Sequence, residues 1–234
     1  NVPYNDLEAI KNAYTTNKTC AVLLEPVQGE GGVNVPSENY LKSVMDFCRE
    51  KNILFMLDEV QTGMGRLGTL FGYQRFDGVE PDVMTLGKAL GAGAPLGAFA
   101  SKDFCSVLEP GDHGSTFGGN ALSTAAGAAA AKFIVDNDVP ALASTGGAYL
   151  TAKLTQLAEK YSFISDIRGL GLLIGIEMTK EIAAPTVQEC LGNGLLINAV
   201  RPNMLRFMPP LNVTEKEIDE AVQILDTSLA NTSK

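Results

Sequence analysis

Three charged residues follow short apolar segments, and their types and spacing point to chemistry at one place. Glu25, Asp58 and Lys88 lie directly after these segments or, for Lys88, one residue further on. The segments span residues 20–24, 53–57 and 82–86. Apolar runs of this length are typical of buried parallel strands. Because ligands bind beyond the carboxyl ends of the strands in open parallel sheets, we expect the three side chains to line one site.

An acid and a lysine at such an edge are compatible with three explanations. Asp58 and Lys88 could form a structural ion pair. They could also belong to a nucleotide hydrolase, but that class needs G-x-x-x-x-G-K-[ST] upstream of the acid, and Ala89 follows Lys88. The third explanation is covalent bonding of Lys88 to an aldehyde cofactor, because burial or nearby cations make a lysine amine a nucleophile and a base. Asp58 would then pair with a protonated ring nitrogen of that cofactor.

The composition argues against several other classes of function. The chain has 234 residues, a formal net charge of −9 and 45% hydrophobic residues, so it can bury a sizeable core. The negative charge argues against nucleic acid and anionic membranes as partners. No run of eighteen apolar residues occurs, and the one histidine excludes a multi-histidine metal site. Four cysteines without CxxC spacing indicate reduced thiols and a cytoplasmic protein, or a mitochondrial matrix protein in a eukaryote.

The first half of the chain predicts a mostly parallel α/β sheet flanked by helices. Besides the three apolar segments, residues 96–100 predict a fourth strand, and residues 37–50 carry apolar side chains at helical spacing. Asn5, with Glu8 three residues later, predicts a helix cap for residues 6–16. Strands that alternate with helices favour parallel pairing.

The second half predicts a smaller α+β domain. We expect helices over 120–135, 147–160 and 186–193, two strands around a glycine-rich bend within 164–177, and further strands at 195–197 and 204–207. Thr214 and Glu217 form a capping box for a last helix to about residue 230. The sequence thus predicts a large-domain portion at 1–122, a connecting helix at 123–135 and a small C-terminal domain at 136–234.

Several longer motifs resemble those of a known family. They are Glu25-Pro-Val-Gln-Gly-Glu-Gly-Gly32, Leu57-Asp-Glu-Val-Gln-Thr-Gly-Met-Gly-Arg66, Leu86-Gly-Lys-Ala-Leu-Gly91, His113-Gly-Ser-Thr-Phe-Gly-Gly-Asn120, Arg168-Gly-Leu-Gly171 and Leu205-Arg-Phe-Met-Pro-Pro210. In this order they resemble the class III aminotransferases, which depend on pyridoxal 5′-phosphate (PLP), and within that family the acetylornithine and ornithine group. The resemblance implies the fold of the fold type I PLP-dependent transferases.

The resemblance implies roles for residues around the cofactor. Lys88 matches the lysine that bonds to PLP, and Asp58 the acid on the pyridine nitrogen. Val60 matches the aliphatic residue on one ring face, and Gln61 the amide near the ring hydroxyl. Two further cofactor-binding residues are implied, Glu59 and Thr116, the latter reaching the phosphate in the partner subunit of a homodimer.

The resemblance also implies how substrate is bound. Ser115 is placed near substrate, and Arg206 matches the arginine that binds a substrate carboxylate. Glu25 matches the acid that pairs with this arginine when another substrate is bound. Without the resemblance, Ser115 could be a turn residue and Arg206 could point into solvent.

The implied reaction is transamination of N-acetylornithine or ornithine with 2-oxoglutarate and glutamate, as in arginine biosynthesis. The family is longer and its N-terminal part is absent from this sequence, which begins Asn1-Val2-Pro3. We therefore expect the 234-residue chain alone to be weakly active or inactive, and a separate N-terminal segment is a possible partner. The alternatives are a non-catalytic fragment or subunit, and another class III aminotransferase acting on 4-aminobutyrate or succinylornithine.

Overall fold

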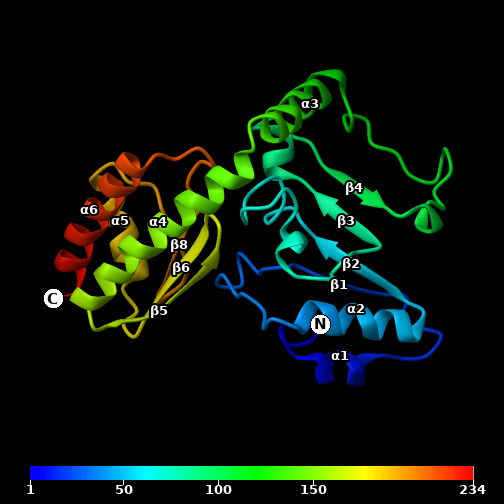
Figure 1. The fold of residues 1–234 in the computed structure, drawn as a ribbon, viewed down its shortest axis with the longest axis horizontal. Coiled ribbons are helices and arrows are strands. Elements are labelled where there is room, and N and C mark those ends of the chain that lie inside the picture. Colours follow the sequence, from blue (N-terminus) through cyan, green and yellow to red (C-terminus); the bar gives the residue numbers. More distant parts are fainter. Residues whose placement is uncertain (234) are drawn as a thin grey trace. The chain divides into compact units, whose positions relative to one another are not determined.

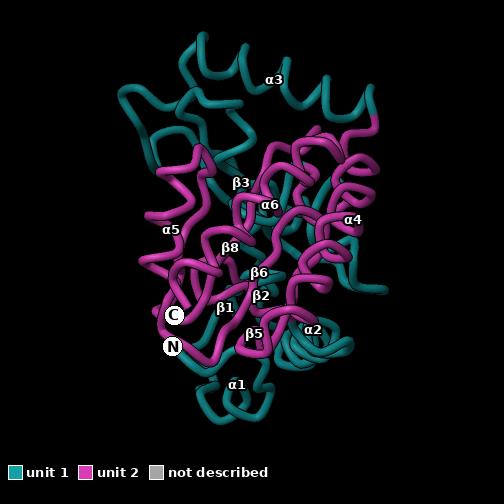
Figure 2. The backbone as a smooth tube through the Cα atoms, turned by 90° about the vertical axis from the view of Figure 1, so that its left-hand side faces the viewer, with its two compact units in different colours: residues 1–27, 36–64, 69–137 teal, residues 28–35, 65–68, 138–234 magenta. Residues whose placement is uncertain are grey.

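A computed structural model describes residues 1–233, which form two compact units. Unit 1 comprises Asn1–Val27, Pro36–Met64 and Thr69–Asn137. Unit 2 comprises Gln28–Val35, Gly65–Gly68 and the described residues from Asp138 onward. Figure 2 colours the two units teal and magenta. Two short segments from the first half of the chain therefore belong to the unit that the second half builds.

Unit 1 contains a four-stranded sheet in the order β1-β2-β3-β4 (Figure 1). Its strands are β1 (Ala21–Leu24), β2 (Leu54–Asp58), β3 (Val83–Leu86) and β4 (Ala98–Ser101). The first three pair in parallel, which confirms the mostly parallel sheet. β4 pairs antiparallel to β3, with Leu86 opposite Ala98, because the chain returns without a helical crossover. The prediction of a parallel fourth strand at 96–100 is thus wrong in its direction. The strand also begins two residues later than predicted, at Ala98.

Unit 1 also contains three α-helices and three short 3₁₀ helices. α1 (Leu7–Ala13) packs on α2 (Tyr40–Lys51), and α2 packs on β1 and β2. The apolar face of α2 carries the predicted helical spacing and forms the core with Phe55 and Leu57. Three short 3₁₀ helices follow, η1 (Gly72–Arg75), η2 (Lys88–Gly91) and η3 (Asp103–Cys105), and then α3 (Ala121–Asp136), which contacts η2.

The cap of α1 differs from the prediction. Asp6, not Asn5, accepts a hydrogen bond from the Ala9 amide at 2.8 Å and caps the helix. Asn5 has a positive φ of 62° and accepts from the amide and hydroxyl of Ser37 instead. Adjacent Asn and Asp both suit a cap, so the sequence alone could not decide between them.

Unit 2 contains an antiparallel sheet in the order β5-β6-β8-β7. Its strands are β5 (Ile164–Leu170), β6 (Leu173–Met178), β7 (Asn198–Arg201) and β8 (Met204–Phe207). The two strands around a glycine-rich bend and the strand at 204–207 are confirmed. The strand expected at 195–197 is wrong; the paired residues begin at Asn198, because Leu195 and Ile197 pack on the core beside the sheet.

Two helices pack on this sheet, α4 (Val139–Lys160) and α5 (Ala183–Gly192), and a third, α6 (Glu215–Thr232), packs on α4 and α5. Their apolar faces and the inner faces of β6 and β8 form one core. The capping box of Thr214 and Glu217 is present as predicted and begins α6. No helix within the described residues is both long and apolar enough to cross a membrane.

Candidate active site

The three strand-end residues of unit 1 lie at the same edge of its sheet. β1, β2 and β3 run in the same direction, with Leu24 opposite Leu57 and Asp58 opposite Thr85. Glu25 follows the last residue of β1, and Lys88 comes two residues after β3 ends. In Figure 1 the arrowheads of β2 and β3 point the same way, and that of β4 points the opposite way. The parallel register thus brings the three positions to the carboxyl edge.

Asp58 is held by neutral partners. Its Oδ1 accepts hydrogen bonds from the Val60 amide at 2.9 Å and the Thr85 hydroxyl at 3.1 Å. No ion pair joins Asp58 to Lys88 within residues 1–233, so the structural ion pair that the spacing allowed is not formed. Backbone and hydroxyl donors therefore fix one carboxylate oxygen in position, and neither donor carries a charge.

Lys88 begins η2 with an unusual backbone conformation. Its φ is 47°, in the left-handed region that residues other than glycine rarely adopt, and the residue is exposed. Backbone strain of this kind persists where the surrounding structure imposes it, and it clusters at functional sites. The sequence showed the position of Lys88 but gave no sign of this strain.

Gly87 and Val60 pack closely beside Lys88. A Cβ on Gly87 would lie 3.3 Å from Cγ1 of Val60, so only glycine lets the backbone before Lys88 approach this side chain without crowding. Val60 is half-buried and the next residue, Gln61, is buried. The predicted cofactor residues of the second motif therefore surround the end of β2.

Glu59 points into a buried network. Its carboxylate accepts from the Thr62 hydroxyl at 2.6 Å, the Gly72 amide at 2.8 Å and the Tyr73 amide at 2.7 Å. Burial raises the pKa of this carboxyl, although the three hydrogen bonds oppose the rise. Glu59 thereby ties the start of η1 to the end of β2, and its predicted contact with cofactor stays a prediction.

Ser115 and Thr116 lie in the exposed loop between η3 and α3. The Ser115 hydroxyl accepts from the Gly118 amide at 3.0 Å, as a turn residue does. Within the described residues no hydrogen bond or ion pair joins this loop to Asp58 or Lys88. The cofactor and substrate roles of the two residues stay predictions.

Unit 2 carries Arg206 in the middle of its sheet. Arg206 is only 7% exposed, which contradicts the alternative that it points into solvent from an edge strand. Its Nη1 donates to Oε1 of Glu30 at 2.7 Å, and its Nε donates to Oδ1 of Asn198 at 3.2 Å. The carboxylate in this contact is Glu30, which the sequence analysis missed although it lies in the same motif as Glu25. The substrate-linked role of Glu25 stays a prediction.

Glu25 lies at a turn that a tyrosine holds. The Tyr4 hydroxyl donates to the backbone oxygens of Glu25 at 3.1 Å and Pro26 at 2.9 Å. Burial, with smaller contributions from Tyr40 and Glu25, raises the pKa of the Tyr4 phenol, so it stays protonated as a donor. Tyr4 therefore fixes the chain where it leaves β1.

Comparison with known families identifies the class of protein. The family model for class-III aminotransferases matches residues 2–229. The acetylornithine aminotransferase of Caldanaerobacter subterraneus subsp. tengcongensis is 48% identical over 229 residues, which cover 98% of this chain and 58% of that protein. The chain belongs to the class-III aminotransferase family, whose members depend on PLP and share the fold type I architecture.

Solved structures agree with this assignment. Ornithine δ-aminotransferase of Plasmodium falciparum matches with a TM-score of 0.92 and 37% identity, covering 99% of this chain and 60% of that one. Acetylornithine aminotransferase of Elizabethkingia anophelis matches with a TM-score of 0.90 and 36% identity, covering 98% and 59%. The chain thus spans a little more than half the length of the relatives that it matches.

Proposed function

We propose that this protein takes part in PLP-dependent transamination, with N-acetylornithine or ornithine as amino donor and 2-oxoglutarate as acceptor. The observation that carries the proposal is the carboxyl edge of β1–β3, where Asp58 and Lys88 follow neighbouring parallel strands without pairing to each other. The names of the similar proteins, acetylornithine and ornithine aminotransferase, support the choice of donor.

The residues at this edge suit PLP. They offer an amine on Lys88, a carboxylate on Asp58, an aliphatic face on Val60 and an amide on Gln61. Gly87 keeps the space beside Val60 free of a side chain, which a Cβ would crowd at 3.3 Å. When bound, PLP supplies an aldehyde that bonds to amines and a ring that withdraws electrons.

Lys88 and Asp58 would have different tasks. Asp58, fixed by Val60 and Thr85, would offer its carboxylate to a protonated ring nitrogen and favour that protonated form. Lys88 would hold the cofactor through its Nζ, and the same amine, once free, would accept the proton from the substrate α-carbon. One lysine therefore serves for binding and for proton transfer.

Arg206 would bind a substrate carboxylate. A guanidinium fork suits a carboxylate, and the buried position of Arg206 strengthens that contact. Its present carboxylate is Glu30, whose side chain is 73% exposed. We infer that Glu30 occupies Arg206 when the substrate has no carboxylate to offer there. The sequence analysis predicted this role for Glu25, whose own part in substrate binding stays a prediction.

We further propose a homodimer. The stretch from β4 to the start of α3 exposes large apolar side chains that a second copy would cover. They are Phe99, Phe104, Val107, Leu108, Phe117 and Leu122. Thr116 lies within this stretch and would reach the cofactor phosphate of the other copy. Sedimentation of the protein at micromolar concentration tests the dimer, and an active monomer would contradict it.

The activity is tested by measuring glutamate formation from 2-oxoglutarate. The assay uses the full-length natural protein. It receives PLP and one donor at a time: N-acetylornithine, ornithine, succinylornithine or 4-aminobutyrate. We expect the highest kcat/KM with N-acetylornithine or ornithine and none in the Lys88→Ala variant. A preference for 4-aminobutyrate would contradict the proposed donor, and no turnover with any donor would contradict the proposed reaction.

A further inference from the structure

The segment of residues 28–35 presents Glu30 to Arg206, and it does so without belonging to a helix or a named strand. A single isolated bridge joins Gln28 to Asn34, with backbone hydrogen bonds of 3.1 Å and 2.9 Å. The Asn34 amide group also donates to Oε1 of Gln28 at 2.9 Å. Short loops of this kind need contacts from outside to keep one conformation.

The conformation of this segment is strained. Val33 has a φ of 49°, which is a genuine outlier for a β-branched residue, and Gly32 precedes it with a φ of 114°. The Val33 side chain is nevertheless fully buried against β6, where a Cβ on Gly175 would lie 3.1 Å from its own Cβ. Something in unit 2 must therefore hold the backbone around Val33 in place.

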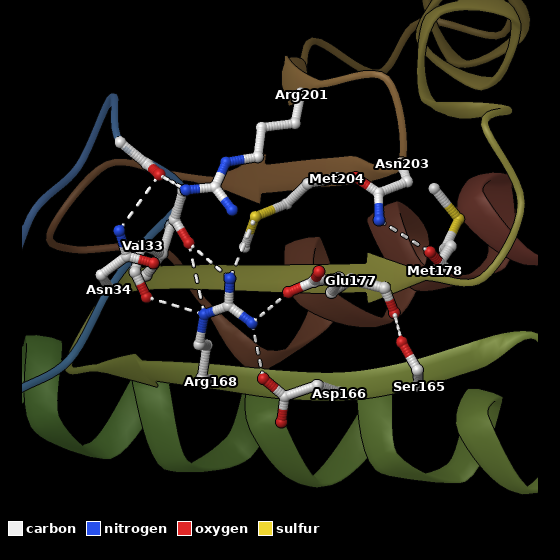
Figure 3. Close-up of polar contacts among 12 residues, drawn as sticks. Val33, Asn34, Ser165, Asp166, Arg168, Glu177, Met178, Arg201, Asn203 and Met204 are labelled. Atoms are coloured by element: carbon white, nitrogen blue, oxygen red, sulfur yellow. Dashed lines mark hydrogen bonds and ion pairs between the residues drawn. The ribbon is translucent and has the colours of Figure 1, made fainter.

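Two arginines of the sheet make such contacts: Arg201 on β7 donates to the Gly31 oxygen, and Arg168 on β5 holds the next two carbonyls. Its Nη2 donates to the Gly32 oxygen at 2.8 Å, and its Nε donates to the Val33 oxygen at 3.1 Å. Figure 3 shows the guanidinium between this segment and the two strands β5 and β6. The two carbonyls that it binds belong to the two residues with positive φ.

Two carboxylates hold Arg168 from the other side. Its Nη1 donates to Asp166 at 2.6 Å and to Glu177 at 2.5 Å, both on the same sheet (Figure 3). Burial lowers the pKa of the guanidinium, but these two acids outweigh the effect and raise it above its ordinary value. The sheet thus fixes the Arg168 guanidinium through Nη1, while its Nε and Nη2 donate to the loop.

We propose that Arg168 is a positioning residue that sets how strongly Glu30 competes with a substrate carboxylate for Arg206. The proposal rests on the proposed function, in which Arg206 binds that carboxylate. By fixing the carbonyls of Gly32 and Val33, Arg168 keeps Glu30 at a high effective concentration beside Arg206. A loosened loop lowers that concentration, so an external carboxylate binds more easily.

Loop anchoring is tested without any activity measurement. In Arg168→Lys the charge stays, but a single ammonium cannot reach two carboxylates and two carbonyls. Hydrogen exchange of the amides of Gln28 and Asn34, which are bonded within the segment, is expected to become about tenfold faster or more. Arg49→Lys on α2, an exposed arginine of unit 1, is the matched control and leaves this exchange unchanged.

The competition is tested by the binding of glutarate, a dicarboxylate that cannot react, measured by calorimetry on the PLP-loaded protein. We expect Glu30→Gln to bind glutarate about fivefold more tightly or better, and Arg168→Lys to show a gain in the same direction. The double variant binds no more tightly than Glu30→Gln alone, because Arg168 acts through Glu30. Glu177→Gln, which removes one support of Arg168, gives a smaller gain.

Two results would overturn the proposal. One is unchanged exchange of residues 28–35 in Arg168→Lys, which would show that the loop does not depend on this side chain. The other is a gain in glutarate binding from Arg168→Lys that persists in full on top of Glu30→Gln. Failure of the proposed function looks different: glutarate binds to no variant, including Glu30→Gln, while the exchange measurement still decides whether Arg168 anchors the loop.

Discussion

The two units hold their charged side chains in different ways. In unit 1, Asp58 and Lys88 lie at the ends of parallel strands, and the partners of Asp58 are an amide and a hydroxyl. In unit 2, Arg168 and Arg206 lie within antiparallel strands, and both bind carboxylates. A charge held by neutral groups stays available for a ligand, whereas a charge that already has an acid must exchange it. We therefore expect substitutions of Asp58 and Lys88 to change chemistry alone, and substitutions of Arg168 and Arg206 to change binding and stability together.

The largest effect is expected from Lys88→Ala. Loss of the amine removes the covalent link to PLP and the base, and general-base catalysis alone contributes about 10²–10⁴-fold to kcat. Because Lys88 is exposed and makes no ion pair with Asp58, the midpoint of thermal unfolding should stay unchanged. Lys102→Ala is the control in the same unit, since Lys102 pairs with Glu80 and Asp82 and should leave kcat unaffected. A large drop in stability with Lys88→Ala would break the contrast between the units.

Asp58→Asn should lower kcat by about 10²–10³-fold, the usual size of such an electrostatic loss. The amide oxygen of Asn can still accept from Val60 and Thr85, so the fold and the bound cofactor should be retained. Steady-state kinetics measures the loss of kcat, and the PLP absorbance band shows whether the cofactor is retained. The exposed Asp77→Asn serves as the control. An unchanged kcat would show that the charge of Asp58 has no part in the reaction.

Arg206→Lys should change two properties at once. Lysine lacks the planar fork, so the KM for 2-oxoglutarate should rise about tenfold while kcat changes less. The weakened contacts to Glu30 and Asn198 should also lower the free energy of unfolding by about 1–3 kcal/mol. Chemical denaturation with Arg75→Lys, an exposed arginine of unit 1, as control measures the second effect. A rise in KM with no loss of stability would remove the proposed difference between the units.

Glu59→Gln sharpens the comparison, because Glu59 has neutral donors as Asp58 does, but it is buried and holds elements of unit 1 together. The amide offers one acceptor oxygen in place of two to Thr62, Gly72 and Tyr73. The free energy of unfolding should fall by about 1–3 kcal/mol. Urea denaturation measures it.

The same variant has a pH dependence with a definite sign. Burial raises the pKa of Glu59 above its ordinary value of 4.5, so the folded chain holds this proton more tightly than the unfolded chain. The stability that this provides is complete below pH 4.5 and is lost as pH rises through the folded pKa. The advantage of the natural protein over Glu59→Gln should therefore shrink as pH rises. An advantage that grows with pH would contradict the cause given for the shift.

The smallest effect concerns two buried thiols, one in each unit. Burial, with a smaller contribution from Asp82, raises the pKa of Cys48 to about 12, and burial also raises that of Cys190. At pH 8 iodoacetamide should label the exposed Cys20 quickly and leave Cys48 and Cys190 intact until their own unit unfolds. Mass spectrometry of digested protein measures the labelling. Fast labelling of Cys48 in the native protein would show that unit 1 opens readily.

The sequence predicted what depends on local pattern. The apolar runs before Asp58 and Lys88 gave the strands, and the order of motifs gave the family. The apolar spacing of α2 and the capping box at Thr214 also appear as expected. These features are local because each depends on side chains a few residues apart.

The features that were missed depend on contacts between distant residues. Glu30 meets Arg206 across 176 positions of sequence, and Arg168 holds Gly32 across 136. No periodic pattern in the sequence indicates such a contact. No sequence pattern predicts the positive φ of Val33 or Lys88 either. The direction of β4 was wrong because alternating strands predict a helical crossover, and the segment between β3 and β4 has only one 3₁₀ turn.

The central claim is that the carboxyl edge of β1–β3 binds PLP through Lys88. Reduction of the PLP-loaded protein with borohydride makes that bond permanent, and peptide mapping by mass spectrometry then locates the label. We predict a single pyridoxyl group on Lys88, lost in Lys88→Ala and kept in Lys102→Ala. A label on another lysine, with Lys88 unmodified, would contradict the assignment.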